Sequence, residues 1–474
     1  MRKTIVADIA IIGGGSGGLS VAAGAAQMGA KVVLVEKHKM GGDCLNYGCV
    51  PSKALIAAGE AAQMVRDSGR FGVNGHEPAI DFAKVNAHVH GVIAAIAPHD
   101  SVERFERLGV QVIKAAGKFV SPTALDAGGH MVTARRFVVA TGSRAFLPPI
   151  PGLDTVPYLT NETVFDLKEP PSHLIVIGGG PIGLELAQAH RRLGCKVTVI
   201  EAFSILPKDD PAATDVVRRR LLAEGLEVVE GAKVTSVAMD GNRIAASLQV
   251  AGVPRTIIGT HLLVAAGRRA NVAGIGLDEA GIKHTAAGIS VDQRLRTSNT
   301  RVFAIGDVAG GPQFTHMASY HAGIVIRNAV FNLPAKADHR AVPWVTYTDP
   351  ELAHVGLSEV QARMHFPGAK AVTWSFEEND RAQAERATDG FVKAVVGKGG
   401  VIVGATIVGR HAGELILPWV LAVQKKLEVS DMASVIAPYP TLGEVTKRVA
   451  GSWYTPTLFS PRTRRVVRWM QRLP

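Results

Sequence analysis

The chain has 474 residues, of which 47% are hydrophobic and 20% are charged, enough for about three globular domains with filled cores. This composition argues against a disordered protein. Three cysteines are too few for an extracellular scaffold held by disulfides, so we expect a cytoplasmic location. No apolar run approaches the length needed to span a bilayer. The net charge of +11 raises nucleic acids and anionic membranes as partners to consider.

The chain opens with the pattern of a dinucleotide-binding βαβ unit. Its parts are an apolar strand at 5–12, Gly13, Gly15 and Gly18, a helix at 19–28, and a strand at 31–35 that ends at Glu36. Glycines at this spacing allow a tight turn and let a pyrophosphate approach the helix N-terminus, while the acid accepts a hydrogen bond from a ribose hydroxyl. The motif alone is weak, but with both strands and the acid it predicts a nucleotide site.

The stretch from Gly41 to Lys53 contains Cys44 and Cys49, two of the three cysteines. Residues five apart on a regular helix point in different directions, so a bridge between them requires a distorted turn, which the glycines of the stretch permit. A helix that begins near Pro51 would direct its positive end at the sulfurs and favour a thiolate. The spacing alone fits two structural cysteines as well as it fits a redox disulfide.

The first pattern recurs about 165 residues later. Its parts are a strand at 173–177, Gly178, Gly180 and Gly183, a helix at 184–192, and a strand at 196–200 that ends at Glu201. Two complete copies predict two nucleotide-binding domains, which is the pair that a flavoenzyme reduced by a nicotinamide cofactor needs. Glu201 favours NAD over NADP, because a carboxylate accepts from a 2′-hydroxyl and repels a 2′-phosphate.

Three further short strands end at glycine. The segments 137–143 and 262–268 predict crossing points between the two nucleotide domains, and the strand at 302–305 places a carboxylate at the usual ligand side of an α/β sheet. Taken alone, the carboxylate of Asp307 would also fit the role of an ordinary capping residue. The residues assigned to cofactor binding from these strand ends are Thr141, Gly142, Gly267 and Asp307.

From about Val345 the glycine fingerprints give way to an α+β pattern. Strands are predicted at 390–396 and 401–408, and helices at 414–426 and 442–450, which indicates a dimerisation or substrate-binding domain. The predicted fold class is therefore α/β, with two Rossmann-like domains and a C-terminal α+β domain. The predicted divisions are 1–155 for FAD, 156–270 for NAD(P), 271–344 as a return to the first domain, and 345–474 for the interface.

The end of the chain, residues 457–474, contains five arginines and no acidic residue. Valine, tryptophan, methionine and leucine interleave with these arginines, which predicts a short amphipathic helix. Such a helix fits contact with a membrane surface or docking on its own protein, and both stay open. Nucleic-acid binding is not expected, because no recognition motif accompanies the charge.

The remaining cysteine and the histidine pairs are given structural roles. Cys195 opens an apolar strand and is expected to be buried. The histidines lack acidic or cysteine partners nearby in the sequence, so no metal site is predicted. These histidines are His88, His90, His316 and His321. Contact with a flavin stays open for His316, which follows the Asp307 segment.

Taken together, the motifs resemble the class I pyridine nucleotide-disulfide oxidoreductases, the family of dihydrolipoamide dehydrogenase, glutathione reductase and mercuric reductase. The resemblance runs from Asp8 to about Tyr454, and its most specific part is Gly-Gly-x-Cys-Leu-Asn-x-Gly-Cys-Val-Pro-Ser-Lys. It implies a homodimer whose active site is shared across the interface. It also implies FAD at the first fingerprint, NAD(P)H at the second, and a redox disulfide between Cys44 and Cys49.

The resemblance also implies roles for individual side chains. Cys49 would be the thiolate beside the flavin, and Cys44 the interchange thiol that attacks the substrate. Lys53 would lie near the reactive nitrogen of the flavin with Glu185 as its carboxylate partner, and Asp307 would bind the ribitol.

Two positions depart from the family pattern. Tyr439 stands where the disulfide reductases have a histidine, although Glu444 is kept. A phenol with a reference pKa of about 10 is not a cation at neutral pH, so it offers the thiolate no ion pair. Asp43, where many relatives have threonine, would disfavour a thiolate further.

Tyrosine at this position resembles mercuric reductase, but that enzyme's C-terminal cysteine pair is missing here. The sequence therefore lies between dihydrolipoamide dehydrogenase and mercuric reductase. The function that it implies is electron transfer from NADH through FAD and Cys44–Cys49 to a thiol or disulfide substrate. The alternatives are a mercuric-ion reductase and a flavoprotein that docks on a membrane or protein through its basic end.

Overall fold

The computed structural model describes residues 3–473, which form two compact units. The first unit consists of the described residues up to Ala202 together with Glu227–Asp338. The second consists of Phe203–Leu226 together with the described residues from His339 onward. The division into four parts made from the sequence is finer than this, and its boundaries stay a prediction.

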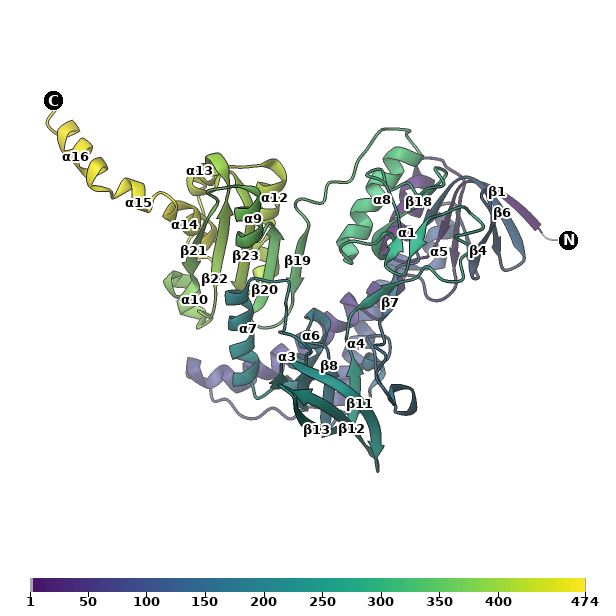
Figure 1. The fold of residues 1–474 in the computed structure, drawn as a ribbon, viewed down its shortest axis with the longest axis horizontal. Helices are drawn as coiled ribbons and strands as arrows, with labels where there is room; N and C mark the ends of the chain where they lie inside the picture. Colours follow the sequence, from purple (N-terminus) through teal and green to yellow (C-terminus); the bar gives the residue numbers. More distant parts are fainter. Residues whose placement is uncertain (1–2, 474) are drawn as a thin grey trace. The chain divides into compact units, whose positions relative to one another are not determined.

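The first unit contains a seven-stranded sheet in the order β3-β2-β1-β6-β5-β4, with β18 also paired to β6 (Figure 1). Its strands are β1 Lys3–Ile12, β2 Val32–Glu36, β3 Val110–Lys114, β4 Gly117–Ser121, β5 Ala124–Ala127, β6 His130–Val139 and β18 Val302–Ala304. Strands β1, β2, β3, β6 and β18 are parallel. Ile9 and Ile11 of β1 face one core layer, whereas Ala10 and Ile12 face the other, as the two-residue period of a strand requires.

Two helices cover the Ile9 face of this sheet. Helix α1 (Ser16–Gln27) and helix α8 (Thr315–Ala329) pack against one another, although nearly 300 residues separate them in the chain. Their apolar residues join those of β1 and β2 in one buried cluster. This packing brings the start of α8 into the neighbourhood of the first glycine turn.

A second, four-stranded parallel sheet has the order β10-β9-β8-β14. Its strands are β8 His173–Ile177, β9 Lys196–Ile200, β10 Glu227–Val229 and β14 His261–Val264, and helix α6 spans Pro181–Arg192. Helix α3 (Cys49–Asp67) runs along α6. The two backbones come close because α3 has Gly59 at the contact, where a Cβ would lie 3.3 Å from Cα of Ala189.

The other elements of the first unit are shorter connections and hairpins. An antiparallel sheet β11-β12-β13 and a two-stranded ladder of β7 with β15 are the main ones. Their bounds, with the remaining helices and strands, are α2 Gly42–Asn46, α4 Phe82–Ile96, α5 Val102–Arg107, β7 Ser143–Ala145, β11 Ala232–Asp240, β12 Arg243–Val250, β13 Val253–Gly259, β15 Arg268–Ala270, β16 His284–Thr285 and β17 Gly288–Ile289.

The second unit is built on a five-stranded antiparallel sheet in the order β19-β20-β23-β22-β21. The strands are β19 Pro343–Thr346, β20 Glu351–Gly356, β21 Lys370–Ser375, β22 Phe391–Val396 and β23 Ile402–Gly409. The helices are α7 Pro211–Ala223, α9 Glu359–His365, α10 Asp380–Glu385, α11 Ala412–Leu415, α12 Leu417–Lys425, α13 Val429–Ser434, α14 Glu444–Ser452, α15 Thr455–Leu458 and α16 Pro461–Met470. Its core packs the sheet against α12 and α14 around the fully buried Trp419.

The predicted α/β fold class, with two Rossmann-like sheets and a C-terminal α+β part, is confirmed. One predicted helix differs, because 414–426 is split into α11 and α12. Pro418 lies in the first turn of α12, and a proline cannot donate the backbone hydrogen bond that would continue α11. Cys195 is buried, as predicted, and its burial raises its pKa to about 12.

Candidate active site

The first glycine turn leaves room for a phosphate group. Gly13 has a φ of +110°, and a Cβ there would collide with the carbonyl oxygen of Ala140; a Cβ on Gly18 would collide with that of Gly13. At Gly15, by contrast, the nearest atom to a Cβ would be 3.8 Å away. Gly15 also begins α1 without a side-chain cap, so the orphan N–H groups of the first turn favour an anion.

Glu36 closes this cradle at the end of β2. One carboxylate oxygen accepts a hydrogen bond from N–H of Gly14 at 2.5 Å, and the other accepts from N–H of His38 at 2.6 Å. The acid is therefore fixed beside the glycine turn, as the fingerprint predicts for a residue that meets a ribose.

The second glycine turn repeats this geometry. Gly178 has a φ of +117°, and Cβ atoms on Gly178 or Gly183 would collide with backbone carbonyl oxygens, whereas nothing lies within 4 Å of a Cβ on Gly180. Glu201 follows β9 and accepts a hydrogen bond from N–H of Gly179 at 2.7 Å. Both cradles thus fit the diphosphate and ribose of a dinucleotide.

The two cysteines lie on either side of a break between two helices. Cys44 belongs to α2, and Cys49 is the first residue of α3. Gly48 between them has φ −125° and ψ −112°, which ends α2 and starts α3 in a new direction. The side-chain amide of Asn46 donates to the carbonyl oxygens of Met40 and Gly42 and stabilises the turn. The distorted turn expected from the sequence is confirmed.

This turn is attached directly to the first cradle. N–H of Gly41 donates to the carbonyl oxygen of Gly14 at 2.9 Å, and Gly41 and Gly15 form an isolated parallel bridge. Gly42 has a φ of +59°, and a Cβ there would lie 2.7 Å from Cα of Gly15. Only glycine permits this approach, so the cysteines lie next to the site where a dinucleotide would bind.

The two thiols are free and have opposite electrostatic character. A hydrogen bond from Cys44 lowers the pKa of Cys49 to about 6, with help from Thr315 and Lys53 and against the effect of burial. The same hydrogen bond and burial raise the pKa of Cys44. Oγ1 of Thr315, at the start of α8, lies 3.3 Å from Sγ of Cys49. At neutral pH, Cys49 is therefore the thiolate and Cys44 keeps the proton.

Asp43 is held by two side chains from distant parts of the chain. Its carboxylate lies 3.2 Å from the guanidinium of Arg268 and accepts a hydrogen bond from the amide of Asn161 at 3.1 Å. The carboxylate raises the pKa of both cysteines, which is the direction predicted from the sequence, but it is the smallest of the effects on each. Pairing with a cation reduces its repulsion of the thiolate.

Lys53 and Glu185 form an ion pair between α3 and α6. Nζ of Lys53 lies 2.7 Å from Oε2 of Glu185, whose side chain is only 7% exposed. The pair joins the helix that follows the cysteines to the helix that follows the second glycine turn. Lys53 lies one helical turn after Cys49, where its positive charge lowers the pKa of that thiol.

Asp307 lies in a short 3-10 turn after β18 and is mostly buried. Burial raises its pKa, and a hydrogen bond of 2.5 Å from the hydroxyl of Ser143 opposes that rise. The guanidinium of Arg268 donates to Ser143 and lies 3.9 Å from Asp307. Arg268 therefore connects Asp43 beside the cysteines with Asp307.

The other strand-end residues directly precede the two strands of the β7–β15 ladder. The side chain of Thr141 and the carbonyl oxygen of Gly142 bond to the backbone of Asn271, and Gly267 accepts from N–H of Phe146. The structure thus brings the three predicted residues together at one crossing of the chain.

Tyr439 and Glu444 belong to the second unit. The hydroxyl of Tyr439 donates to Asp380 at 2.7 Å, and this hydrogen bond raises the pKa of the phenol. The phenol is 66% exposed. Glu444 opens α14 and lies 2.7 Å from Arg448. Their placement at the cysteines of a partner subunit stays a prediction.

The sequence predicts no acidic partner for the paired histidines, but Nε2 of His90 lies 3.8 Å from the carboxylate of Asp166. His88 and His90 are exposed on α4, and His321 is buried and accepts a hydrogen bond from N–H of Gly306. Across residues 3–473, no group of three histidine, cysteine or acidic side chains has the arrangement of a metal site.

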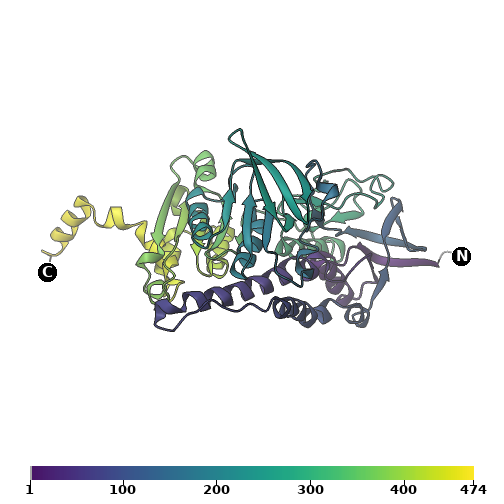
Figure 2. The ribbon, with the colours of Figure 1, turned by 90° about the horizontal axis from the view of Figure 1, so that it is seen from below.

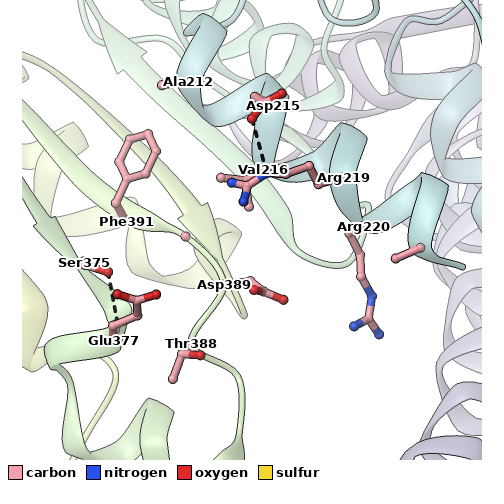
Figure 3. A pocket seen from close by; sticks show the side chains of 12 residues that line it. Ala212, Asp215, Val216, Arg219, Arg220, Ser375, Glu377, Thr388, Asp389 and Phe391 are labelled. Atoms are coloured by element: carbon pink, nitrogen blue, oxygen red, sulfur yellow. Dashed lines mark hydrogen bonds and ion pairs between the residues drawn. The ribbon is translucent and has the colours of Figure 1, made fainter.

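A pocket of about 530 Å³ lies in the second unit, between α7 and the segment 375–391 (Figure 3). Arginines of α7 and carboxylates of both sides face it, but no predicted site residue lines it. We assign it no role in the chemistry of the cysteines. The charged residues that line it are Asp215, Arg219, Arg220, Glu377 and Asp389.

The sequence did not single out four side chains of this site, which are Ser143, Asn161, Arg268 and Thr315. Ser143 and Arg268 directly follow the predicted residues Gly142 and Gly267, so the sequence indicated the two segments. It did not indicate that the side chains of Ser143 and Arg268 contact each other. Nothing in the sequence near Thr315 indicates contact with a cysteine 266 residues earlier.

Comparison with known families agrees with this geometry. The family model described as pyridine nucleotide-disulphide oxidoreductase matches residues 7–322, and the dimerisation domain of the same family matches residues 342–450. The chain belongs to the pyridine nucleotide-disulphide oxidoreductases. As a member of this family it is an FAD- and pyridine nucleotide-dependent disulfide oxidoreductase with a dimerisation domain, which confirms the family and enzyme class expected from the sequence.

Curated relatives cover almost all of this oxidoreductase. It is 35% identical over 443 residues to mercuric reductase from Bacillus cereus, covering 93% of this chain and 70% of that one. It is 37% identical over 455 residues to dihydrolipoyl dehydrogenase from Geobacillus stearothermophilus, covering 94% and 96% of the two chains. Mercuric reductase and dihydrolipoyl dehydrogenase are the two enzymes between which the motifs place this sequence.

Solved structures of flavoprotein reductases superpose on most of this oxidoreductase. LpdA from Mycobacterium tuberculosis has a TM-score of 0.86 at 28% identity and covers 95% of this chain and 99% of its own. The HOCl-induced flavoprotein disulfide reductase RclA from Escherichia coli, in a Cu(II) complex, has a TM-score of 0.85 at 27% identity, with coverage of 94% and 99%.

Proposed function

We propose that this oxidoreductase passes electrons from NADH through FAD to the Cys44–Cys49 pair and on to a thiol or disulfide substrate, in the manner of dihydrolipoamide dehydrogenase. The observation that carries the proposal is the polarised pair of thiols attached to the first dinucleotide cradle. Bound FAD supplies the step between a two-electron nicotinamide donor and a disulfide. The rest of the chemistry belongs to side chains of this chain.

Each of the two cradles binds a different cofactor. The first, with Thr141, Gly142 and Asp307 at the neighbouring strand ends, holds FAD, and the second, with Gly267 nearby, holds NADH. NADH is favoured over NADPH because the carboxylate of Glu201, fixed by Gly179, would repel a 2′-phosphate. The FAD-binding set of the first fingerprint is Gly13, Gly15, Gly18 and Glu36, and the NADH-binding set is Gly178, Gly180, Gly183 and Glu201.

The thiols divide the work of disulfide exchange. Cys44 attacks one sulfur of the substrate disulfide and forms a mixed disulfide, and its proton goes to the first substrate sulfur, which leaves as a thiol. Cys49 then attacks the sulfur of Cys44, restores the Cys44–Cys49 disulfide and releases the second substrate thiol. Cys49 is suited to that second step because it is ionised at neutral pH.

The second substrate sulfur leaves as a thiolate that needs a proton, and Tyr439 is the donor that we assign to it. In a homodimer the phenol and Glu444 of one subunit would complete the site of the other, which the dimerisation domain supports. Asp380 holds the phenol in its protonated form, so it can donate but cannot form an ion pair with a thiolate.

The test uses the FAD-loaded enzyme without oxygen. Reduction by NADH should give a long-wavelength absorbance band from a thiolate beside the flavin. The band should be absent in Cys49→Ala and kept in the matched control Cys195→Ala, which removes a buried thiol outside the site. A wild-type spectrum without the band would overturn the assignment of Cys49, whether or not a substrate is known.

A mercuric-ion reductase is the second candidate, because Tyr439 stands where the disulfide reductases have a histidine. Mercuric reductases are also among the relatives at 35% identity. NADH oxidation should be compared with lipoamide, a lipoylated protein, glutathione disulfide, a quinone and mercuric ion in excess thiol. Turnover with a disulfide supports the first proposal, and turnover with mercuric ion alone would replace it.

A further inference from the structure

The last described helix of the second unit is not covered by any other element of that unit. Helix α16 begins at Pro461, after Ser460 accepts a hydrogen bond from N–H of Thr463, and no residue from 461 to 473 is buried. In both views α15 and α16 extend away from the sheet and helices of the second unit (Figures 1 and 2). We call residues 461–473 the tail.

The tail has two chemically distinct faces. At about 100° per residue, the apolar side chains of α16 fall on one side of the helix axis and three arginines on the other. The apolar side chains are between 44% and 62% exposed. Arg462 in the first turn is the exception to the pattern. The apolar face consists of Val466, Val467, Trp469 and Met470, and the basic face of Arg464, Arg465 and Arg468. Arg472 and Leu473 follow the last residue of the helix.

Apolar exposure continues just before the tail. Leu458 at the end of α15 is 55% exposed, and Phe459 after it is 63% exposed. A run of large apolar side chains left in water marks a surface that contacts an apolar phase or a partner.

The charge on the tail selects among partners. No acidic residue lies between Thr457 and Pro474, so two tails would repel each other. A nucleic acid would satisfy the arginines but leave the tryptophan, valine and methionine face in water. An anionic lipid surface satisfies both faces at once.

We propose that the tail binds the surface of an anionic lipid bilayer. The helix lies in the plane of the interface, with Trp469 and its apolar neighbours between the headgroups and the arginines on the headgroup phosphates. The contact is peripheral, since no helix within residues 3–473 is both long and apolar enough to cross a membrane. It adds a binding activity to the reductase and does not depend on which substrate the cysteines reduce.

Vesicle co-sedimentation of the full-length FAD-loaded enzyme tests the proposal. Vesicles of phosphatidylcholine with phosphatidylglycerol should bind on the order of tenfold more enzyme than phosphatidylcholine alone, and high salt should abolish the difference. Arg464→Glu/Arg468→Glu removes the basic face, and Val466→Ser/Trp469→Ser removes the apolar face. Both should lose vesicle binding while NADH oxidation is unchanged.

The control is Arg107→Glu/Arg301→Glu, which changes the net charge equally at two exposed arginines of the first unit. It should bind vesicles like the wild type. If the control lost as much vesicle binding as the tail variants, the loss would be explained by the overall charge alone, and the proposal would be overturned. Full binding by the tail variants, or no binding by the wild type, would overturn it as well.

Two further outcomes would assign the tail to another partner. Size-exclusion chromatography of the tail variants would show smaller particles than the wild type if a second copy covers the apolar face. Binding of the wild type to an oligonucleotide but not to anionic vesicles would point to nucleic acid. Either result would overturn the assignment to a lipid surface.

Discussion

Thr315 is the residue that most directly connects a distant helix to the chemistry of the thiols. Its hydroxyl lies 3.3 Å from the sulfur of Cys49 and lowers the pKa of that thiol. We expect Thr315→Val to shift the ionisation of Cys49 to higher pH, whereas Thr315→Ser keeps the hydroxyl and should leave it near 6. Ultraviolet thiolate absorbance of the reduced protein against pH measures the shift, and equal curves for the two variants would contradict it.

The same thiol makes the stability of the reduced protein depend on pH. Its pKa is about 6 in the folded protein and 9.0 in an ordinary setting, so between these values the unfolded chain binds more protons. The stabilisation from Cys49 is complete above pH 9.0 and is lost as the pH falls through about 6. In urea unfolding of the reduced protein, this loss should be smaller in Cys49→Ser than in the wild type.

Asp43 and Arg268 form the second residue-scale test. Arg268→Met leaves the Asp43 carboxylate without its cation, 3.2 Å away in the wild type, so the thiolate of Cys49 should become harder to form. Asp43→Asn should have the opposite effect on Cys49. The pKa of Cys49 is measured in the two single variants and in the double variant. If each substitution shifts that pKa equally with and without the other substitution, the two residues do not act as a pair.

At the scale of elements, the attachment of α2 to the first glycine turn depends on Gly42. Gly42→Ala adds a Cβ 2.7 Å from Cα of Gly15, at a φ of +59°, so backbone must move. We expect a loss of roughly 2–4 kcal/mol in unfolding free energy and faster release of FAD. Gly29→Ala is the matched control, because it has a φ of +81° with nothing within 4 Å of the Cβ, and it should lose only about 1 kcal/mol.

The elements themselves follow from local patterns. Both βαβ units occur within a few residues of the predicted bounds, because short continuous apolar runs that end at glycine turns constrain the backbone locally. The amphipathic helix predicted in the last part of the chain is confirmed as α16. The break between α11 and α12 was missed, since the helical period continues through it and Pro418 fits the first turn of a new helix.

At the scale of the whole molecule, the proposed function requires two chains. Neither Cys49→Ala nor the double variant Tyr439→Ala/Glu444→Ala should support more than about 1% of wild-type turnover alone. A mixed dimer of the two has one site with intact cysteines and an intact partner tyrosine. Mixing after reversible dissociation should therefore restore part of the turnover, and no recovery in verified mixed dimers would place Tyr439 outside the shared site.

The sequence by itself determined the two nucleotide cradles, the cysteine pair and the family, because each depends on short spacings that the backbone cannot satisfy in other ways. Only the tertiary structure decided which charges and hydroxyls meet those residues. Lys53 meets Glu185 across 132 positions and Cys49 meets Thr315 across 266. Such contacts arise where packed helices from different sheets come within a few ångströms, and no local pattern along the chain records that distance.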